Sequence, residues 1–216
     1  MNLHLDFLPS AVYASAGHHP EHLADLRRSG LTDETITRQK IRSVPPHMIE
    51  QLLGFDPRGV LSAYLIPFPD SHGGWMNHVR LKVFPTITTD RGSIKYLQPR
   101  GSRVRLFFPL ATLPAVVQGN APLWLVEGEK KSLAVAQLGF PAVGFSGIEG
   151  WHARGSRGLL PDFDAIPFRG RLLEFVPDGD VQTNPNVERG ARRFAEALAA
   201  RGARVRLVRL PVGVAA

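Results

Sequence analysis

From Pro122 onward, short apolar runs alternate with amphipathic stretches, and this alternation limits the fold more than any other feature of the chain. Strands that alternate with helices form a parallel sheet with right-handed crossovers. The predicted strands are Leu123–Val126, Pro141–Phe145, Arg171–Val176 and Arg204–Leu210. The predicted helices are Glu129–Leu138 and Asn186–Arg201, each followed by a glycine suited to a C-cap. The segment therefore predicts an α/β domain with flanking helices.

Acidic residues follow two of these strands directly. Glu127 ends one strand, and Asp178 and Asp180 follow another, 51 and 53 residues further along. Ligands of a parallel sheet collect at the carboxyl ends of its strands, so the three carboxylates should meet at one edge. A divalent cation would offset their mutual repulsion. Magnesium suits such hard oxygen ligands, manganese is the alternative, and Gly179 leaves room for a phosphate.

Taken singly, Glu-Gly and Asp-Gly-Asp are typical of turns. Their joint occurrence at the ends of two buried strands favours a site. The run Val126-Glu127-Gly128 before one helix and Val176–Asp180 before another resembles the Toprim domain of DnaG-type primases, topoisomerases, OLD-family nucleases and the recombination protein RecR. Glu127–Ala134, with Gly144–Gly147 after it, is similar to the Toprim-like domains of phage and plasmid replication proteins.

The resemblance extends upstream of this domain. Ile66-Pro67, a strand bearing Arg80 and Lys82, and the run Lys95–Pro99 are similar to the small basic subdomain that precedes Toprim in DnaG-type primases. Between His78 and Leu106 the only acidic residue is Asp90, whereas seven residues are basic. These are Arg80, Lys82, Arg91, Lys95, Arg100, Arg103 and Arg105. Such a patch suits a template strand or a triphosphate, and a solvated basic strand face is the alternative. The predicted division is a helical N-terminal region (1–58), a small basic α+β subdomain (59–118) and a Toprim domain (119–216).

The resemblance implies a role for each acidic residue. Glu127 would be the general acid or base, and Asp178 and Asp180 the magnesium ligands, with Glu127 available as a further ligand. Lys130 and Lys131 are candidates for phosphate contacts. The alternative is that they lie in solvent, one helical turn after Glu127. The implied partners are single-stranded DNA, nucleoside triphosphates and a separately encoded helicase.

The chain also departs from these families. It has no cysteine, which excludes the zinc ribbon that opens full DnaG-type primases, and Gly128–Ser132 lacks the glycine that a phosphate loop requires. The segment Val181–Asn186 is longer than the usual glycine turn, so no third acidic ligand after Asp180 is assigned. A topoisomerase is not expected, because a chain of this length has no room for a catalytic tyrosine domain around any of its tyrosines, Tyr13, Tyr64 and Tyr96.

Two other segments carry side chains that could form a site. His18-His19-Pro20-Glu21-His22 offers metal ligands, but the proline is expected to break their helical pairing. Trp151 and His152 either line the acidic edge or, for Trp151, pack into the core.

Charge and composition agree with a polyanionic partner. The net charge of +7 favours nucleic acid. The absence of an apolar run long enough to span a bilayer, and of a secretory signal, predicts a cytoplasmic protein without membrane contact. The favoured function is that of a primase-like nucleotidyltransferase in the DNA replication of a mobile element. The alternatives are a Toprim nuclease acting on DNA or RNA and a non-catalytic nucleic-acid-binding factor of replication or recombination.

Overall fold

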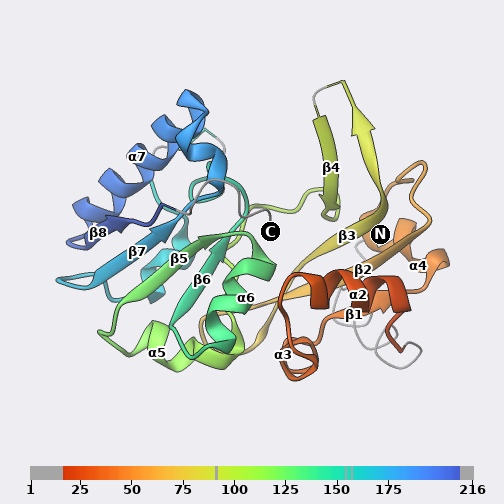
Figure 1. The fold of residues 1–216 in the computed structure, drawn as a ribbon, viewed down its shortest axis with the longest axis horizontal. Helices are drawn as coiled ribbons and strands as arrows, with labels where there is room; N and C mark the ends of the chain where they lie inside the picture. The colour runs from red at the N-terminus through yellow and green to blue at the C-terminus, as the bar shows by residue number, and fades with distance from the viewer. Residues whose placement is uncertain (1–16, 91, 154, 157, 210–216) are drawn as a thin grey trace. The chain divides into compact units, whose positions relative to one another are not determined.

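The computed structural model describes residues 17–90, 92–153, 155–156 and 158–209. The chain divides into two compact units (Figure 1). Unit 1 comprises residues 1–28, 32–68 and 75–102, and unit 2 comprises residues 29–31, 69–74 and 103–216. The predicted helical region and most of the predicted basic subdomain thus fall within the same unit.

Three helices of unit 1 begin where the sequence supplies a helix start. They are α2 (Pro20–Arg28), α3 (Asp33–Arg38) and α4 (Pro46–Leu53). The Thr32 hydroxyl accepts a hydrogen bond from the backbone N–H of Thr35, as expected of an N-cap, and Asp33 and Glu34 lie in the first turn of α3. Gly54 ends α4 at a φ of 71°, which glycine adopts without strain.

A four-stranded sheet in the order β1-β2-β3-β4 completes unit 1. Its strands are β1 (Arg42–Val44), β2 (Ser62–Pro69), β3 (Trp75–Thr89) and β4 (Gly92–Leu97). The pairs β1–β2 and β3–β4 are antiparallel. Alternate residues of β3, among them Val79, Leu81 and Val83, pack with Ile49 and Leu53 of α4 in one core.

Unit 2 contains a four-stranded parallel sheet in the order β6-β5-β7-β8. Its strands are β5 (Leu123–Glu127), β6 (Ala142–Phe145), β7 (Leu172–Val176) and β8 (Arg204–Leu207). The predicted α/β class, with a Rossmann-like parallel sheet preceded by a smaller α+β part, is confirmed.

Helices lie on both faces of this sheet. They are α5 (Leu113–Val117), α6 (Glu129–Gln137) and α7 (Pro185–Ala200), with short 3-10 turns η1 (Leu110–Thr112), η2 (Pro161–Ala165) and η3 (Gly179–Gln182). The crossovers β5–α6–β6 and β7–α7–β8 run in opposite directions along the sheet, which puts α6 and α7 on opposite faces (Figure 1). Within the described residues, no helix combines the length and apolar character that a membrane span needs.

An aromatic cluster holds α7 against the sheet. Phe194 of α7 is fully buried and lies 5.3 Å from Phe145 and 5.1 Å from Phe175, measured between ring centroids. Trp151 stacks on the same ring at 5.2 Å and is 4% exposed. The prediction that Trp151 packs into the core is therefore confirmed.

From the sequence, Val104–Phe108 is a further strand candidate, but these residues do not form a strand. This segment makes a single bridge, in which Phe107 and Gly144 exchange backbone hydrogen bonds of 2.9 and 2.8 Å. The neighbouring backbone N–H of Leu106 donates instead to Asp162 Oδ2 at 2.8 Å, and Arg105 pairs with the same carboxylate. The Asp162 side chain thus accepts the Leu106 N–H that would otherwise be available to pair with a neighbouring strand.

Gly144 lies at this bridge, and we expect Gly144→Ala to destabilise unit 2. A Cβ added there would be 2.7 Å from Ser132 Oγ and 3.2 Å from Phe107 Cβ. Overpacking of this kind costs about 1–3 kcal/mol. Urea unfolding should show the loss, whereas Gly179→Ala, whose added Cβ would have no atom within 4 Å, should leave the midpoint nearly unchanged. Equal midpoints for the two variants would contradict the packing argument.

Candidate acidic site at the carboxyl edge of the parallel sheet

Glu127 and Asp178 lie together at the carboxyl edge of the sheet. Glu127 is the last residue of β5, and Asp178 follows the neighbouring strand β7, with Val126 opposite Val176. The backbone N–H of Asp178 donates to Glu127 Oε2 at 3.0 Å. Because a backbone donor of one strand end holds the carboxylate of the other, the two acidic motifs form one site.

Lys131 contributes a positive charge to this site. Gly128 turns the chain from β5 into α6 at a φ of 101°, which favours glycine. Lys131 then lies one turn into the helix from Glu127, and its ammonium forms an ion pair with Asp178 Oδ1. Both side chains are a little over 40% exposed, so the pair can exchange with water or a ligand. Lys131, one of the two lysines predicted to contact phosphate, is thus bonded to the acidic pair.

Asp180 lies in the short 3-10 turn η3, directly after Asp178 and Gly179. Its side chain is outside the described part of the structure, so its role as a metal ligand stays a prediction. Glu127 and Asp178 fit magnesium chemically, because both offer carboxylate oxygens, the hard ligands that this ion prefers, and both side chains are partly exposed at the carboxyl edge of the sheet.

Glu129 was missed as a structural member of this motif. It is 2% exposed, and its Oε1 accepts a hydrogen bond of 2.8 Å from the Ser146 hydroxyl, which follows β6. The Ser132 hydroxyl donates to the Glu129 carbonyl at 2.8 Å. These bonds tie the start of α6 to the segment after β6. One signal for this pairing was present, since Ser146 and Glu129 both belong to the segments that resemble the phage and plasmid replication proteins.

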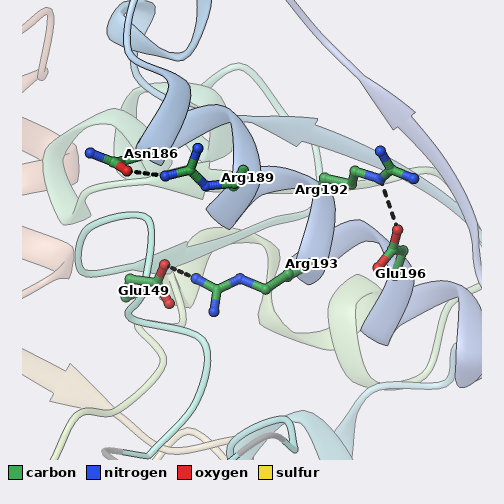
Figure 2. A pocket seen from close by; sticks show the side chains of 6 residues that line it. All are labelled: Glu149, Asn186, Arg189, Arg192, Arg193 and Glu196. Atoms are coloured by element: carbon green, nitrogen blue, oxygen red, sulfur yellow. Dashed lines mark hydrogen bonds and ion pairs between the residues drawn. The ribbon is translucent and has the colours of Figure 1, made fainter.

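A pocket of about 640 Å³ lies on α7, and sequence reasoning did not find it (Figure 2). Its lining residues come from α7 and from the segment after β6, and they are Glu149, Asn186, Arg189, Arg192, Arg193 and Glu196. Arg193 pairs with Glu149, which also accepts from His152 Nε2 at 2.8 Å, and Arg192 pairs with Glu196 at 3.0 Å. The arginines are thus largely matched by carboxylates, which leaves little excess charge in the pocket.

The predicted basic residues are distributed over both units. In unit 1, Lys95 on β4 and Arg100 are exposed, and the Arg80 guanidinium lies over the ring of Tyr96 at 4.8 Å. Arg103 is exposed and belongs to unit 2. Arg91 lies outside the described residues.

Lys82 has a different environment. Its side chain is 7% exposed, its ammonium lies 4.2 Å from the centre of the Phe84 ring, and it donates to the Val83 carbonyl at 3.4 Å. Lys82 therefore does not belong to the exposed basic surface that Lys95 and Arg100 offer.

Two solved primase structures are similar to this chain. The Aquifex aeolicus primase, comprising zinc-binding and RNA polymerase domains, matches with a TM-score of 0.66 and 16% identity over 97% of this chain and 54% of that one. The catalytic domain of a DnaG primase bound to single-stranded DNA matches with a TM-score of 0.59 and 21% identity, over 96% and 72% of the two chains. The likeness spans both units. The chain has the fold of a DnaG primase catalytic core. The predicted primase and Toprim resemblance is therefore confirmed at the level of the fold.

This chain, whose fold is similar to theirs, spans about half the length of the Aquifex protein. Sequence comparisons add less. Residues 114–215 match a family described as a domain of unknown function, DUF3854. The cyclic AMP-responsive element-binding protein 3-like protein 2 of Mus musculus is 36% identical over 104 residues, which cover 44% of this chain and 19% of that protein. Neither match covers half of this chain, so the likeness to primases is one of fold, shown by the two solved structures.

Proposed function

We propose that the chain is a magnesium-dependent nucleotidyltransferase that makes short primers on single-stranded DNA during replication of a mobile element. The observation that carries the proposal is the contact between Glu127 and Asp178 at the carboxyl edge of the sheet. In a primase-like fold, that edge offers carboxylates where phosphodiester chemistry needs a metal.

Each residue of the edge has a role in this proposal. Asp178 and Asp180 would hold magnesium, which would supply positive charge to offset that of the reacting phosphate oxygens. Glu127 takes the proton of the attacking hydroxyl as general base, and the N–H of Asp178 keeps its carboxylate in place. Lys131, whose ammonium pairs with Asp178, would contact an oxygen of the incoming triphosphate.

Exposed cations bind the template strand in this proposal. Lys95, Arg100 and Arg103 are exposed and would contact phosphates, which displaces counterions from the strand. The similar DnaG domain described with single-stranded DNA supports this choice of partner. A separately encoded helicase would supply the unwound template.

One experiment separates the three candidate functions. The protein is incubated with magnesium, unlabelled single-stranded DNA and labelled nucleoside triphosphates, and in parallel with end-labelled DNA and unlabelled nucleotides. Labelled oligonucleotides in the first reaction support priming. Shortened DNA in the second reaction identifies a nuclease, and DNA binding without either product identifies a non-catalytic factor. Ribo- and deoxynucleotides are tested separately.

Lys131→Met tests the contact to the triphosphate. Loss of one charge-assisted hydrogen bond is expected to raise the KM for nucleotide by about 10-fold or more, with a smaller change in kcat. Lys130→Met removes the same charge from the adjacent position and should have the smaller effect. Steady-state kinetics over a range of nucleotide concentrations measure both variants. A KM that is unchanged in Lys131→Met would contradict the role of Lys131.

A further inference from the structure

A second group of metal-ligating side chains lies in unit 1, in the run His18–His22. Pro20 does not break this run, contrary to the expectation from the sequence. It occupies the first turn of α2, where its fixed φ suits a helix start, and the His19 carbonyl accepts a hydrogen bond of 3.1 Å from the N–H of Leu23. His19 therefore precedes the helix directly, and Glu21 and His22 lie in its first turn.

This geometry brings three ligands together. One ligand atom from each of His19, Glu21 and His22 lies within 4.8 Å of the others, and the two imidazole rings are 5.0 Å apart between centroids. Two imidazoles and one carboxylate form a ligand set that zinc binds in proteins, with a fourth position for water. Zinc bonds to nitrogen and oxygen measure about 2.0–2.2 Å, so the ligands must approach one another slightly on binding. His19 and Glu21 are exposed and can make this adjustment.

His22 supplies the rigid part of the group. Its side chain is 1% exposed, Nδ1 lies 2.8 Å from Ser43 Oγ and Nε2 lies 3.0 Å from Ser62 Oγ. Metal-binding histidines usually donate their second ring N–H to such a partner, which orients the ring. The serine hydroxyl bonded to the other ring nitrogen of His22 would have to move away before that nitrogen could bind a cation. Ser43 also accepts the backbone N–H of His19 at 2.8 Å, so one hydroxyl links both histidines.

We propose that His19, Glu21 and His22 bind a zinc ion. The site is independent of the proposed enzymatic function, because its ligands belong to unit 1 whereas Glu127 and Asp178 belong to unit 2. The ion would tie the start of α2 to the sheet through the serine, Ser43 of β1 or Ser62 of β2, that keeps its bond to His22. Bound zinc should therefore stabilise unit 1, since a ligand that binds only the folded state raises its stability.

The test uses untagged full-length protein that has been stripped with a chelator and kept in millimolar magnesium. Zinc chloride is titrated by calorimetry, and the metal content is measured after gel filtration. We expect one zinc per chain and a higher unfolding temperature. His19→Ala and Glu21→Gln should each weaken binding by about 100-fold or more, since loss of even an outer partner costs 10–100-fold.

Matched controls are His47→Ala and Glu50→Gln, which change the same residue types at exposed positions of α4. Both should bind zinc as the wild type does, and so should Asp178→Asn. Absence of stoichiometric zinc would overturn the proposal, as would zinc binding that survives in the His19→Ala/Glu21→Gln double variant. Because binding is read without any enzyme assay, failure of this site is distinguishable from failure of the primase proposal.

Discussion

Replacing Asp178 by asparagine should reduce the proposed magnesium-dependent primer synthesis by about 10²- to 10⁴-fold. Asparagine keeps the size of the side chain but loses the charge that would hold the cation beside Glu127. Metal stabilisation of the transition state is worth several kcal/mol, and each 1.36 kcal/mol corresponds to about tenfold in rate. Primer synthesis is measured over a range of magnesium and manganese concentrations, with binding of single-stranded DNA measured in parallel.

Asp164→Asn is the matched control. Asp164 carries the same charge in the same domain, and its ion pair with Arg201 is exposed, so its loss should change the activity little. Asp178→Asn also removes the partner of Lys131, and therefore both variants are first compared by thermal unfolding. Full activity in a folded Asp178→Asn variant would exclude the proposed role of this edge. Lost activity together with lost DNA binding would indicate a defect outside the chemical step.

Arg171→Leu is expected to destabilise unit 2 by about 3 kcal/mol or more. The guanidinium of this 3%-exposed residue donates to the carbonyls of Ala115, Val116 and Ala121, at 2.6–2.8 Å. Burial lowers the pKa of Arg171 from its usual value, although the group stays protonated. Removing the donor leaves buried carbonyls without a partner, each at a cost of about 1–3 kcal/mol.

The effect is measured as a change in the free energy of unfolding by urea. Arg171→Lys should recover only part of the loss, because an ammonium lacks the planar fork that reaches three carbonyls. Arg204→Leu, on the adjacent strand, removes an exposed arginine and should cost less than about 0.5 kcal/mol. Similar losses in Arg171→Leu and Arg204→Leu would show that the three carbonyl bonds contribute little.

The acidic edge could be predicted because it depends on strand ends. Short apolar runs locate β5 and β7, and the parallel arrangement then brings the residues after them to one side of the sheet. The meeting of Glu127 and Asp178 follows from that topology without knowledge of any side-chain angle. The N-cap at Thr32 was equally predictable, because it depends on a few neighbouring residues.

Other features depend on long-range partners that local patterns do not reveal. The pairing of Phe107 with Gly144 and the capture of the Leu106 N–H by Asp162 join segments 37 and 56 residues apart. From the sequence, Arg171 is predicted to be the polar first residue of a strand. Nothing nearby in the sequence indicates that its side chain is buried and bonded to the carbonyls of α5. Pro20 was misread for a different reason, because the same residue that ends a helix also suits its first turn.

The Phe107–Gly144 bridge bears on self-association of the protein. Unpaired strand edges recruit other chains, and a parallel sheet has two of them. Phe107 already occupies part of the outer side of β6 through its two backbone hydrogen bonds. The opposite edge strand, β8, has only four residues, and Arg204 and Arg206 lie on it. Short length and charge both oppose edge-to-edge pairing, so concentrated solutions of the protein should resist growth of intermolecular β-structure along either side of this sheet.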